Sequence, residues 1–587
     1  MGLLQKAVET YDANSTLIGV YRDGHEPLAP IGHTLTNANI EITLDQAGTF
    51  MAARRVDKFE PKILIPVTEQ SGGRSSTGAK KHPHPLCDQI KYIIAEENYY
   101  IPKLEEWSIS PHSHPFLAAI LSYVKSKALE GDLARSIDTI KEDDMVCWRV
   151  NGFDGEEPAC WKNQNLFRVY IDYYCDQLSA RNFGLCMISG KNVPVAVQHP
   201  KGIIPINGNA KLISANDSSG FTYRGRFQED WQAATVGYIA SQKAHNALRW
   251  LASEQGVREF SGNRIFLCWN PQGIQIPRPM RRLRAADAEP IRQPSDYRQA
   301  LHHTMMSYRK DKQLKGTETA ILASFDAATT GRLSLTYYTE ISLDRFLERM
   351  ERWETSCCWY NGSYGVQAPN LLQIVECAFG LQRANVLEVD DKIQRQYLQR
   401  LLDCKVSGGI FPSDILRALT QRASMPQAYV EAVWRRIVFT ACSALQKYRF
   451  DTNQGGNEMG WELDRHDRSF QFGRLLAVME RGEADYYSKT QEPRQTNAIK
   501  FMSEYRQRPW FVFERINRQL HQAYLNRIDP WQANRYERLT GEIVAILGEF
   551  PEEELNKPLE DTYLMGYELQ RNAFFAKRET NDNETEE

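Results

Sequence analysis

The spacing of the apolar residues changes along the chain, from a period of two near the N-terminus to a helical period near the C-terminus. Residues 40–44 (IEITL) alternate in polarity, and a turn at 45–48 leads into 49–56 (TFMAARRV), which predicts a hairpin. Residues 62–68 (KILIPVT) form a further β-like run. From about residue 368, apolar residues recur every three or four positions, as in 470–484. This switch predicts an α+β fold, with a mixed β-rich N-terminal region and a C-terminal α-helical bundle.

The chain has 587 residues, which allows about two to four domains. Residues 274–316 carry four prolines and ten Lys or Arg against four Asp or Glu, which predicts a basic, exposed linker. Two β-like runs around a Thr-Gly turn follow, and then a helix from Ser342 to about Trp353. We therefore predict an α+β domain at 1–275, the linker with a small hairpin-helix unit at 276–367, a helical connecting region at 368–458 and the bundle at 459–587.

The composition excludes several classes of protein. Lys and Arg number 71 and Asp and Glu 74, so the net charge of −3 excludes a histone-like chain but not local cationic stripes. A hydrophobic content of 42% excludes a disordered chain. The sequence contains no run of eighteen apolar residues, no signal-peptide pattern and no Cys-x-x-Cys. We therefore expect a cytoplasmic protein in a reducing compartment, with no membrane segment.

The segment SGGRSSTGAKKHPHP, residues 71–85, is the longest Gly/Ser/Lys/Pro stretch in the chain, and it is not expected to form a helix or a central strand. Its cations suit phosphates, its hydroxyl groups suit phosphates or base edges, and its glycines let a backbone approach closely. The alternative is an ordinary solvated loop. The candidate DNA-binding residues of this loop are Arg74, Ser75, Ser76, Thr77, Gly78, Lys80 and Lys81.

A second polar segment, residues 207–227, has similar chemistry. It combines cations with amides that can read base edges and with two aromatic residues that can stack or wedge. The alternative is an ordinary polar connection. The candidate DNA-binding residues here are Asn207, Lys211, Asn216, Arg224 and Arg226.

A cationic stripe is expected on a helix over residues 508–520. Arg508, Arg515 and Arg518 are seven and three residues apart, so they share one face of that helix. Such a stripe suits a nucleic-acid backbone, although a solvated face is the commoner fate of a charge run.

Histidine and cysteine clusters were considered as metal ligands. His82, His84 and Cys87 lie close together, as do His112 and His114, but neither group supplies four ligands at zinc spacing. Both groups are better interpreted as ordinary loop residues. We therefore expect no metal site and no cofactor.

Catalytic patterns are also missing from the sequence. His466–Asp467 is similar to the metal-binding dyad of some phosphohydrolases, but the further His and Asp ligands of that dyad cannot be placed. There is no P-loop, GxSxG, GxGxxG or HExxH pattern. We expect a binding or assembly role without catalytic residues. A metal-dependent nuclease and a pure protein scaffold are the two alternatives.

Seven segments follow one another over nearly the whole chain: LLQKAVETYDANS, KILIPVT, LCDQIKYIIA, MISGKNVPVAVQHPKGI, AILASFDAATTGRLSLTYYTEISLDRFLERM, DRSFQFGRLLAVMER and DTYLMGYELQRNAFF. Their order and patterns resemble the large subunit of the type I-C CRISPR effector complex, Cascade. KILIPVT with the loop after it resembles the family's strand and Gly-Ile-Lys-Pro-Asn-Phe loop. The fourth segment resembles its His-Pro-x-x-Lys-Gly block, and the last its Leu-Gly-Tyr-Tyr-x-Gln-Arg helix.

The resemblance implies a non-catalytic, prokaryotic antiviral surveillance role. The subunit would recognise the PAM in double-stranded DNA, assist duplex opening, and bind the displaced single strand through Arg508, Arg515 and Arg518. Its implied partners are a guide-RNA complex with backbone and guide-end-capping subunits, and a separate helicase-nuclease. A small helical subunit is a further implied partner, made by internal translation from a start such as Met459.

Overall fold

Two compact units make up the chain in this computed structural model. The N-terminal unit comprises Met1–Ile276 and Thr319–Ile341, and the C-terminal unit comprises Pro277–Glu318 and Ser342–Glu587. The four-part division drawn from the sequence stays a prediction. The structure describes residues 2–74, 81–97, 99–180, 182–204, 210–214, 227, 229–260, 264–283, 290–329, 331–454 and 462–576.

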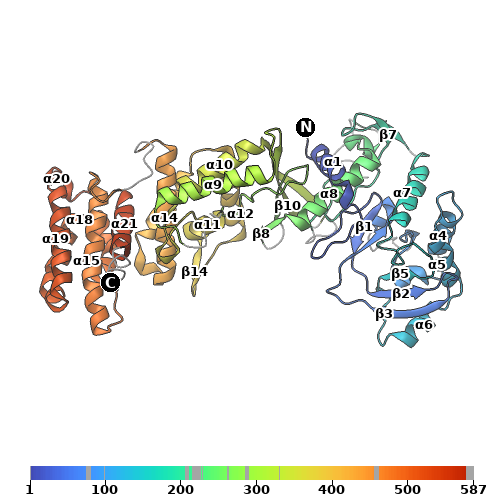
Figure 1. Ribbon diagram of the computed structural model, residues 1–587, viewed down its shortest axis with the longest axis horizontal. Helices are drawn as coiled ribbons and strands as arrows, with labels where there is room; N and C mark the ends of the chain where they lie inside the picture. Colours follow the sequence, from blue (N-terminus) through green and yellow to red (C-terminus); the bar gives the residue numbers. More distant parts are fainter. Residues whose placement is uncertain are drawn as a thin grey trace. The chain divides into compact units, whose positions relative to one another are not determined.

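The first sheet of the N-terminal unit confirms the expected hairpin. Strand β2 (Ile40–Leu44) pairs antiparallel with β3 (Phe50–Arg55) and parallel with β5 (Val146–Val150). In the connecting turn, the Asp45 carboxylate accepts two backbone N–H groups, and Gly48 adopts a φ of +84°. Helices α5 (Pro115–Lys125) and α6 (Leu129–Ser136) lie against this sheet (Figure 1).

Two further sheets frame the rest of this unit. Strand β1 (His33–Thr36) pairs antiparallel with β4 (Ile63–Pro66). A four-stranded sheet in the order β11-β10-β9-β8 includes the long hairpin that the sequence predicted. The bounds of its strands are β8 Val257–Phe260, β9 Arg264–Trp269, β10 Thr319–Thr329 and β11 Arg332–Ser342.

Helices cover these sheets, and α1 packs against α8. Helix α8 begins at Tyr238, after a 3₁₀ turn at Asp230–Ala234. A short hairpin, β6 (Phe183–Leu185) with β7 (Asn192–Pro194), precedes that turn. The helices are α1 Leu3–Ala13, α2 Glu69–Gly73, α3 Ile90–Ile93, α4 Tyr100–Ser108, α5 Pro115–Lys125, α6 Leu129–Ser136, α7 Gln164–Leu178 and α8 Tyr238–Glu254.

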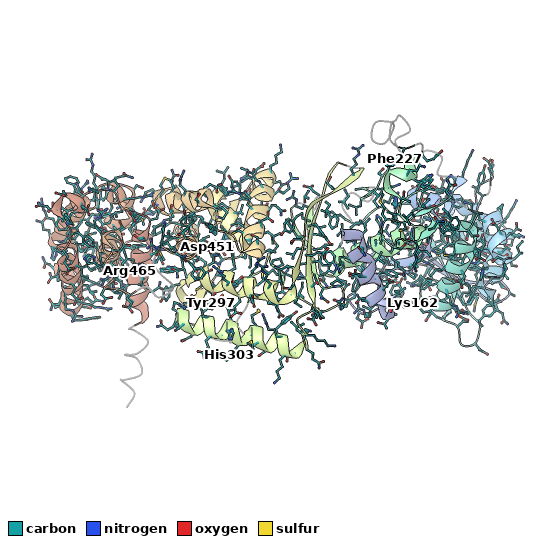
Figure 2. All side chains as sticks on the ribbon, turned by 90° about the horizontal axis from the view of Figure 1, so that it is seen from above. Lys162, Phe227, Tyr297, His303, Asp451 and Arg465 are labelled. Carbon is teal, nitrogen blue, oxygen red and sulfur yellow. The ribbon has the colours of Figure 1, made fainter. Side chains whose placement is uncertain are left out.

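Part of the predicted linker is a helix instead. Residues Pro294–Asp311 form α9, because Pro294 starts the helix and Tyr297, Leu301 and Met305 recur at helical spacing on its buried face. His303 lies on the exposed face of the same helix (Figure 2). The prediction of an exposed linker is therefore wrong for this stretch.

The rest of the C-terminal unit is mainly helical, as predicted. One exception is the hairpin of β14 (Leu381–Arg383) with β15 (Val386–Glu388), and a second small pair is β12 (Trp359–Tyr360) with β13 (Val366–Gln367). Its helices after α9 are α10 Leu343–Ser356, α11 Leu371–Phe379, α12 Asp391–Ser407, α13 Ser413–Ala423, α14 Glu431–Asp451, α15 Arg468–Thr490, α16 Asn497–Lys500, α17 Met502–Gln507, α18 Pro509–Ala523, α19 Pro530–Leu547, α20 Glu552–Leu555 and α21 Thr562–Ala576.

Two glycines let α15 and α21 cross in backbone contact. A Cβ atom added at Gly473 would lie 1.9 Å from the Tyr563 carbonyl oxygen, and one added at Gly566 would lie 2.0 Å from that of Phe470. Any side chain at either position would force the helices apart. These helices come from the last two of the seven segments that carry the family resemblance.

Candidate nucleic-acid interface

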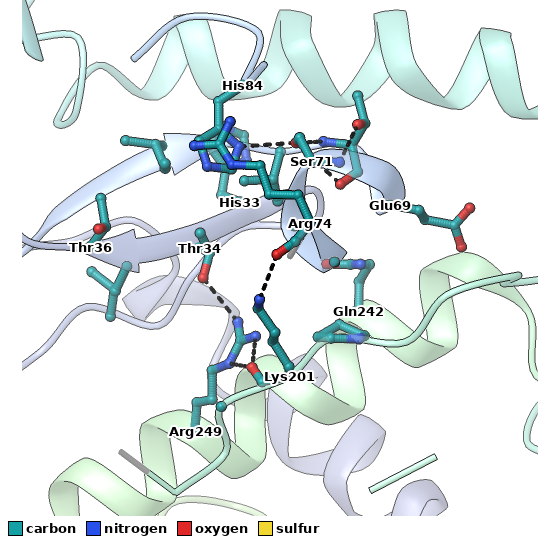
Figure 3. A pocket seen from close by; sticks show the side chains of 18 of the residues that line it. His33, Thr34, Thr36, Glu69, Ser71, Arg74, His84, Lys201, Gln242 and Arg249 are labelled. Carbon is teal, nitrogen blue, oxygen red and sulfur yellow. Dashed lines mark hydrogen bonds between the residues drawn. The ribbon is translucent and has the colours of Figure 1, made fainter. Parts of the chain in front are cut away.

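A pocket of about 540 Å³ opens in the N-terminal unit (Figure 3). It is walled by β1, by α2 with Arg74 directly after it, by residues 198–203 and by α8. Arg74 and His84, which lie towards the two ends of the 71–85 segment, both line it. Among the described residues, four Lys or Arg and two Glu line the pocket, so its charge favours an anion.

The structure corrects the start of the 71–85 segment. Residues 71–73 are the end of α2, because Thr68 and Ser71 form a reciprocal capping box that starts this helix. The Arg74 guanidinium then makes two hydrogen bonds to the Asp88 carboxylate, at 2.5 and 2.8 Å, and stacks over the Tyr92 ring. Arg74 is therefore held by a buried carboxylate at the pocket wall.

Two lysines approach the end of α2 from a different segment. Lys201 and Lys211 are antiparallel bridge partners, and the Lys201 ammonium donates to the Arg74 carbonyl at 3.2 Å. A Cβ atom on Gly73 would lie 3.8 Å from the Lys211 Nζ atom. Burial lowers the pKa of Lys201, and the charges of Lys211, Arg74 and Arg249 lower it further. Burial also lowers the pKa of Lys211.

Arg249 reaches the same pocket from α8. Its guanidinium donates to the Thr34 hydroxyl and the Asn246 side-chain oxygen, both at 3.2 Å, and to the Lys201 carbonyl. These acceptors are neutral oxygen atoms. Burial lowers the pKa of Arg249 to about 10, so the guanidinium stays charged at neutral pH.

The pocket's acidic side chain at α2 is tied into the backbone. One Glu69 carboxylate oxygen accepts the backbone N–H groups of Val197 and Gln198, at 3.0 and 3.3 Å. Its charge raises the pKa of Lys211, but burial outweighs this effect. Glu69 thus fixes residues 197–198 beside α2. The positively charged side chains at the pocket still outnumber the negatively charged ones.

Three buried histidines complete the wall. Burial lowers the pKa of His33, His84 and His199 to about 4, so all three rings are neutral at pH 7. His84 Nδ1 lies 3.0 Å from the Ser71 hydroxyl, and His199 Nδ1 lies 2.8 Å from that of Ser241. The histidines therefore add shape and hydrogen bonds, and the positive charge comes from the lysines and arginines.

The candidate residues are only partly within the described chain. Arg74 lines the pocket and the Lys211 ammonium lies beside Gly73 at its wall, whereas Lys81 is exposed. The candidates Ser75, Ser76, Thr77, Gly78, Lys80, Asn207, Asn216, Arg224 and Arg226, as well as Met459, lie outside the described residues.

The predicted stripe at 508–520 needs one correction. Arg508 precedes α18 as its N-cap residue, so only Arg515 and Arg518 lie on the helix itself. All three side chains are exposed, and Arg515 stacks over the Phe501 ring at 4.2 Å. Their role toward a single strand stays a prediction.

Sequence reasoning missed Lys201 and Arg249. Lys201 lies in the His-Pro-Lys-Gly stretch of the fourth family-like segment, which was a usable signal. Arg249 had no such signal, because it occurs in a helix whose pattern is dominated by apolar residues such as Leu248 and Leu251. Its position opposite β1 depends on tertiary packing.

The His466–Asp467 dyad has a structural explanation. The Asp467 carboxylate caps α15 by accepting the Phe470 N–H at 3.0 Å, and His466 contacts the Glu549 carboxylate at 3.1 Å. Among the described residues, no group of three or more His, Cys, Asp or Glu side chains is arranged to hold a metal ion. No helix in the described ranges is long and apolar enough to span a bilayer.

The matching family model covers residues 9–575 and belongs to the CRISPR-associated proteins. Within that class, the chain is a member of the family described as CRISPR-associated protein (Cas_Csd1). A search of curated proteins finds no match. Family membership places the chain in CRISPR-based defence, as a component of an effector complex.

Proposed function

We propose that this chain is the non-catalytic large subunit of a type I-C effector complex, and that its N-terminal unit recognises the PAM in duplex DNA. The observation that carries this proposal is the convergence of Arg74, Lys201 and Arg249 on the lining of one pocket, with the Lys211 ammonium beside Gly73 at its wall. Partly buried cations with lowered pKa values gain stability when an anion approaches. A DNA phosphate at the pocket rim supplies that anion and positions the duplex for base-edge reading.

The remaining roles follow from the division of labour in such a complex. The guide RNA reads the target strand, and the protein reads only the short PAM and stabilises the opened duplex. The exposed Arg508, Arg515 and Arg518 then contact the displaced strand electrostatically. We propose the guide-RNA complex, a small helical subunit and a helicase-nuclease as its partners, in the prokaryotic cytoplasm.

The test uses the reconstituted, guide-loaded complex and a duplex library with randomised PAM. The double variant Lys201→Ala/Lys211→Ala should weaken duplex binding about tenfold or more, because two phosphate-directed charges are lost. Lys162→Ala is the matched control, since this exposed lysine of the same unit stands outside the pocket lining. Complex composition is checked by native mass spectrometry.

Unchanged binding and PAM preference in the double variant, with assembly intact, would refute the pocket assignment and favour a pure scaffold. Plasmid nicking with Mg²⁺ or Mn²⁺ that a carboxylate substitution abolishes would favour a metal-dependent nuclease. Failure of the complex to assemble with this chain would refute the type I-C assignment itself.

A further inference from the structure

A second, larger pocket of about 970 Å³ lies within the C-terminal unit. Its walls come from the turn at 360–365, from α14, from the end of α21, and from residues 292–293 just before α9. Among the residues that the structure describes, none lines both this pocket and the cationic pocket of the N-terminal unit.

One wall presents an aromatic ring to solvent. Tyr364 is 74% exposed, although large aromatic side chains are usually buried. The turn that carries it is well defined, because the Asn361 N–H donates to the Gly365 carbonyl at 2.9 Å and the Val366 N–H donates to the Ile291 carbonyl at 2.7 Å. A fixed turn therefore holds an exposed tyrosine at the edge of the pocket.

Another part of the wall holds guanidinium groups in fixed positions. Arg435 contacts the Glu480 carboxylate at 2.8 Å and the Tyr567 hydroxyl at 2.8 Å, and Arg571 contacts Glu480 at 3.4 Å and Glu568 at 3.2 Å. Although burial acts to raise the pKa of Glu480, both arginines together hold it below its ordinary value. The network thus stays ionised and keeps its geometry.

Apart from the Glu431 carboxylate, the remaining lining groups have chemistry that suits a nucleobase. Three amide side chains reach the pocket, and amides are able to pair with the edges of nucleobases. Apolar side chains line it as well, which suits a planar ring removed from water. The amides are Gln293, Asn361 and Asn572, the apolar residues are Phe439, Leu463 and Leu569, and Arg292 is a third guanidinium.

We propose that this pocket receives an unstacked base of single-stranded nucleic acid. Tyr364 provides the stacking surface, the amides contact the base edge, and Arg292 contacts the neighbouring phosphate. The inference rests on the proposed function, because that function brings a displaced single strand to this protein. It adds a site that reads bases by stacking, separate from the exposed arginines near α18.

The experiment measures binding of the full-length protein to a thymidine oligonucleotide of about twelve residues with a central 2-aminopurine. Stacking on Tyr364 should quench the fluorescence of 2-aminopurine. Tyr364→Ala should abolish that quenching and weaken binding about five- to fiftyfold, which is the range for losing one stacked base. Tyr364→Phe should retain both, because the ring remains.

Trp531→Ala is the matched control, since Trp531 is a 62% exposed aromatic residue of the same unit outside the pocket. Lys201→Ala/Lys211→Ala should lose duplex binding and keep the quenching, which separates failure of this proposal from failure of the proposed function. Absence of quenching in the wild type, or equal affinity and quenching in Tyr364→Ala, would overturn the inference.

Discussion

Lys405 and Lys447, which are buried in the C-terminal unit, and the cations that line the N-terminal pocket have different chemical surroundings. In the C-terminal unit, Lys405 lies 2.9 Å from Glu354, and the two side chains are 2% and 1% exposed. Lys447 and Asp451 form a second such pair, with both side chains 5% exposed. Each of these cations has a carboxylate partner within its own unit, so its charge is neutralised inside the fold.

In the N-terminal pocket, partly buried cations donate mainly to neutral oxygen atoms. Arg249 donates to a hydroxyl, an amide and a backbone carbonyl, and Lys201 donates to a second carbonyl. Arg74 is the exception, because Asp88 binds it with both oxygens. A buried ion pair therefore serves the fold, because its two charges neutralise each other. Cations that donate to neutral oxygen atoms keep a positive electrostatic potential that can attract an anionic ligand.

The largest expected effect is acid sensitivity confined to the N-terminal unit. His33, His84 and His199 have folded pKa values of about 4, below the unfolded value near 6.5. Stability from these neutral rings is present above pH 6.5 and is lost as the pH falls toward 4, because the unfolded chain binds protons first. At pH 5 the loss is about 2 kcal/mol per ring.

Hydrogen-exchange mass spectrometry at pH 7 and pH 5, corrected for intrinsic exchange rates, compares peptides of α7 and α8 with peptides of α14 and α15. None of the four histidines of the C-terminal unit is buried, since three are exposed and His521 is partly exposed, so its protection should change little over this range. His199→Gln should reduce the acid effect, whereas His303→Gln, on the exposed face of α9, should not (Figure 2). Equal loss of protection in both units would contradict the comparison.

The next largest effect concerns the buried pair of the C-terminal unit. Lys405→Ala leaves the Glu354 carboxylate buried without its cation, which should lower the free energy of unfolding by about 3–5 kcal/mol. Lys489→Ala is the control, because this half-exposed lysine lies 3.8 Å from Asp529 and should matter by less than about 1 kcal/mol. Urea unfolding followed by circular dichroism measures both variants.

The double variant Lys405→Met/Glu354→Leu should recover most of that loss, because an apolar pair replaces the ion pair. Duplex affinity of the folded complex should not change in any of these variants. A marked loss of duplex binding by folded Lys405→Ala would show that the pair serves more than the fold.

The elements that the sequence predicted correctly are those with a local pattern, such as alternating polarity or a turn motif. The strand at 40–44 follows from alternation with an Asp-to-Gly turn after it, and Gly48 has the positive φ that such a turn needs. The hairpin at 381–388 had no such signal, because its turn places Ala384 at a φ of +51°, a conformation that alanine rarely adopts. The sequence there predicted helix, and tertiary packing decided otherwise.

The candidate site was less predictable than the fold for a related reason. Arg74 and Lys211 were chosen from polar segments, which are visible in the sequence. Lys201 and Arg249 join them only because bridge pairing with Lys211 and the packing of α8 bring distant segments to one pocket. Residues that are brought together by such long-range contacts have no characteristic spacing in the sequence, so sequence patterns could not predict this site.

The smallest expected effect is a pH dependence of duplex binding on the alkaline side. Burial lowers the pKa values of Lys201 and Lys211, and brings that of Arg249 to about 10. A bound phosphate favours the charged forms and raises these values, so affinity is full at neutral pH and declines as the pH rises through the values of the free protein.

We therefore expect the dissociation constant for a PAM-containing duplex to increase several-fold, about two- to fivefold, between pH 7.5 and 9.5 at fixed ionic strength. A lysine in a model peptide has a pKa near 10.4, so a contact made by such a group would change little over that range. The Lys201→Ala/Lys211→Ala complex should bind more weakly throughout but with a flatter profile, whereas Lys162→Ala should follow the wild type. If the dissociation constant of the wild-type complex did not change with pH, the phosphates would be bound by exposed cations. The contrast between the C-terminal ion pairs and the N-terminal pocket cations would then have no bearing on DNA binding.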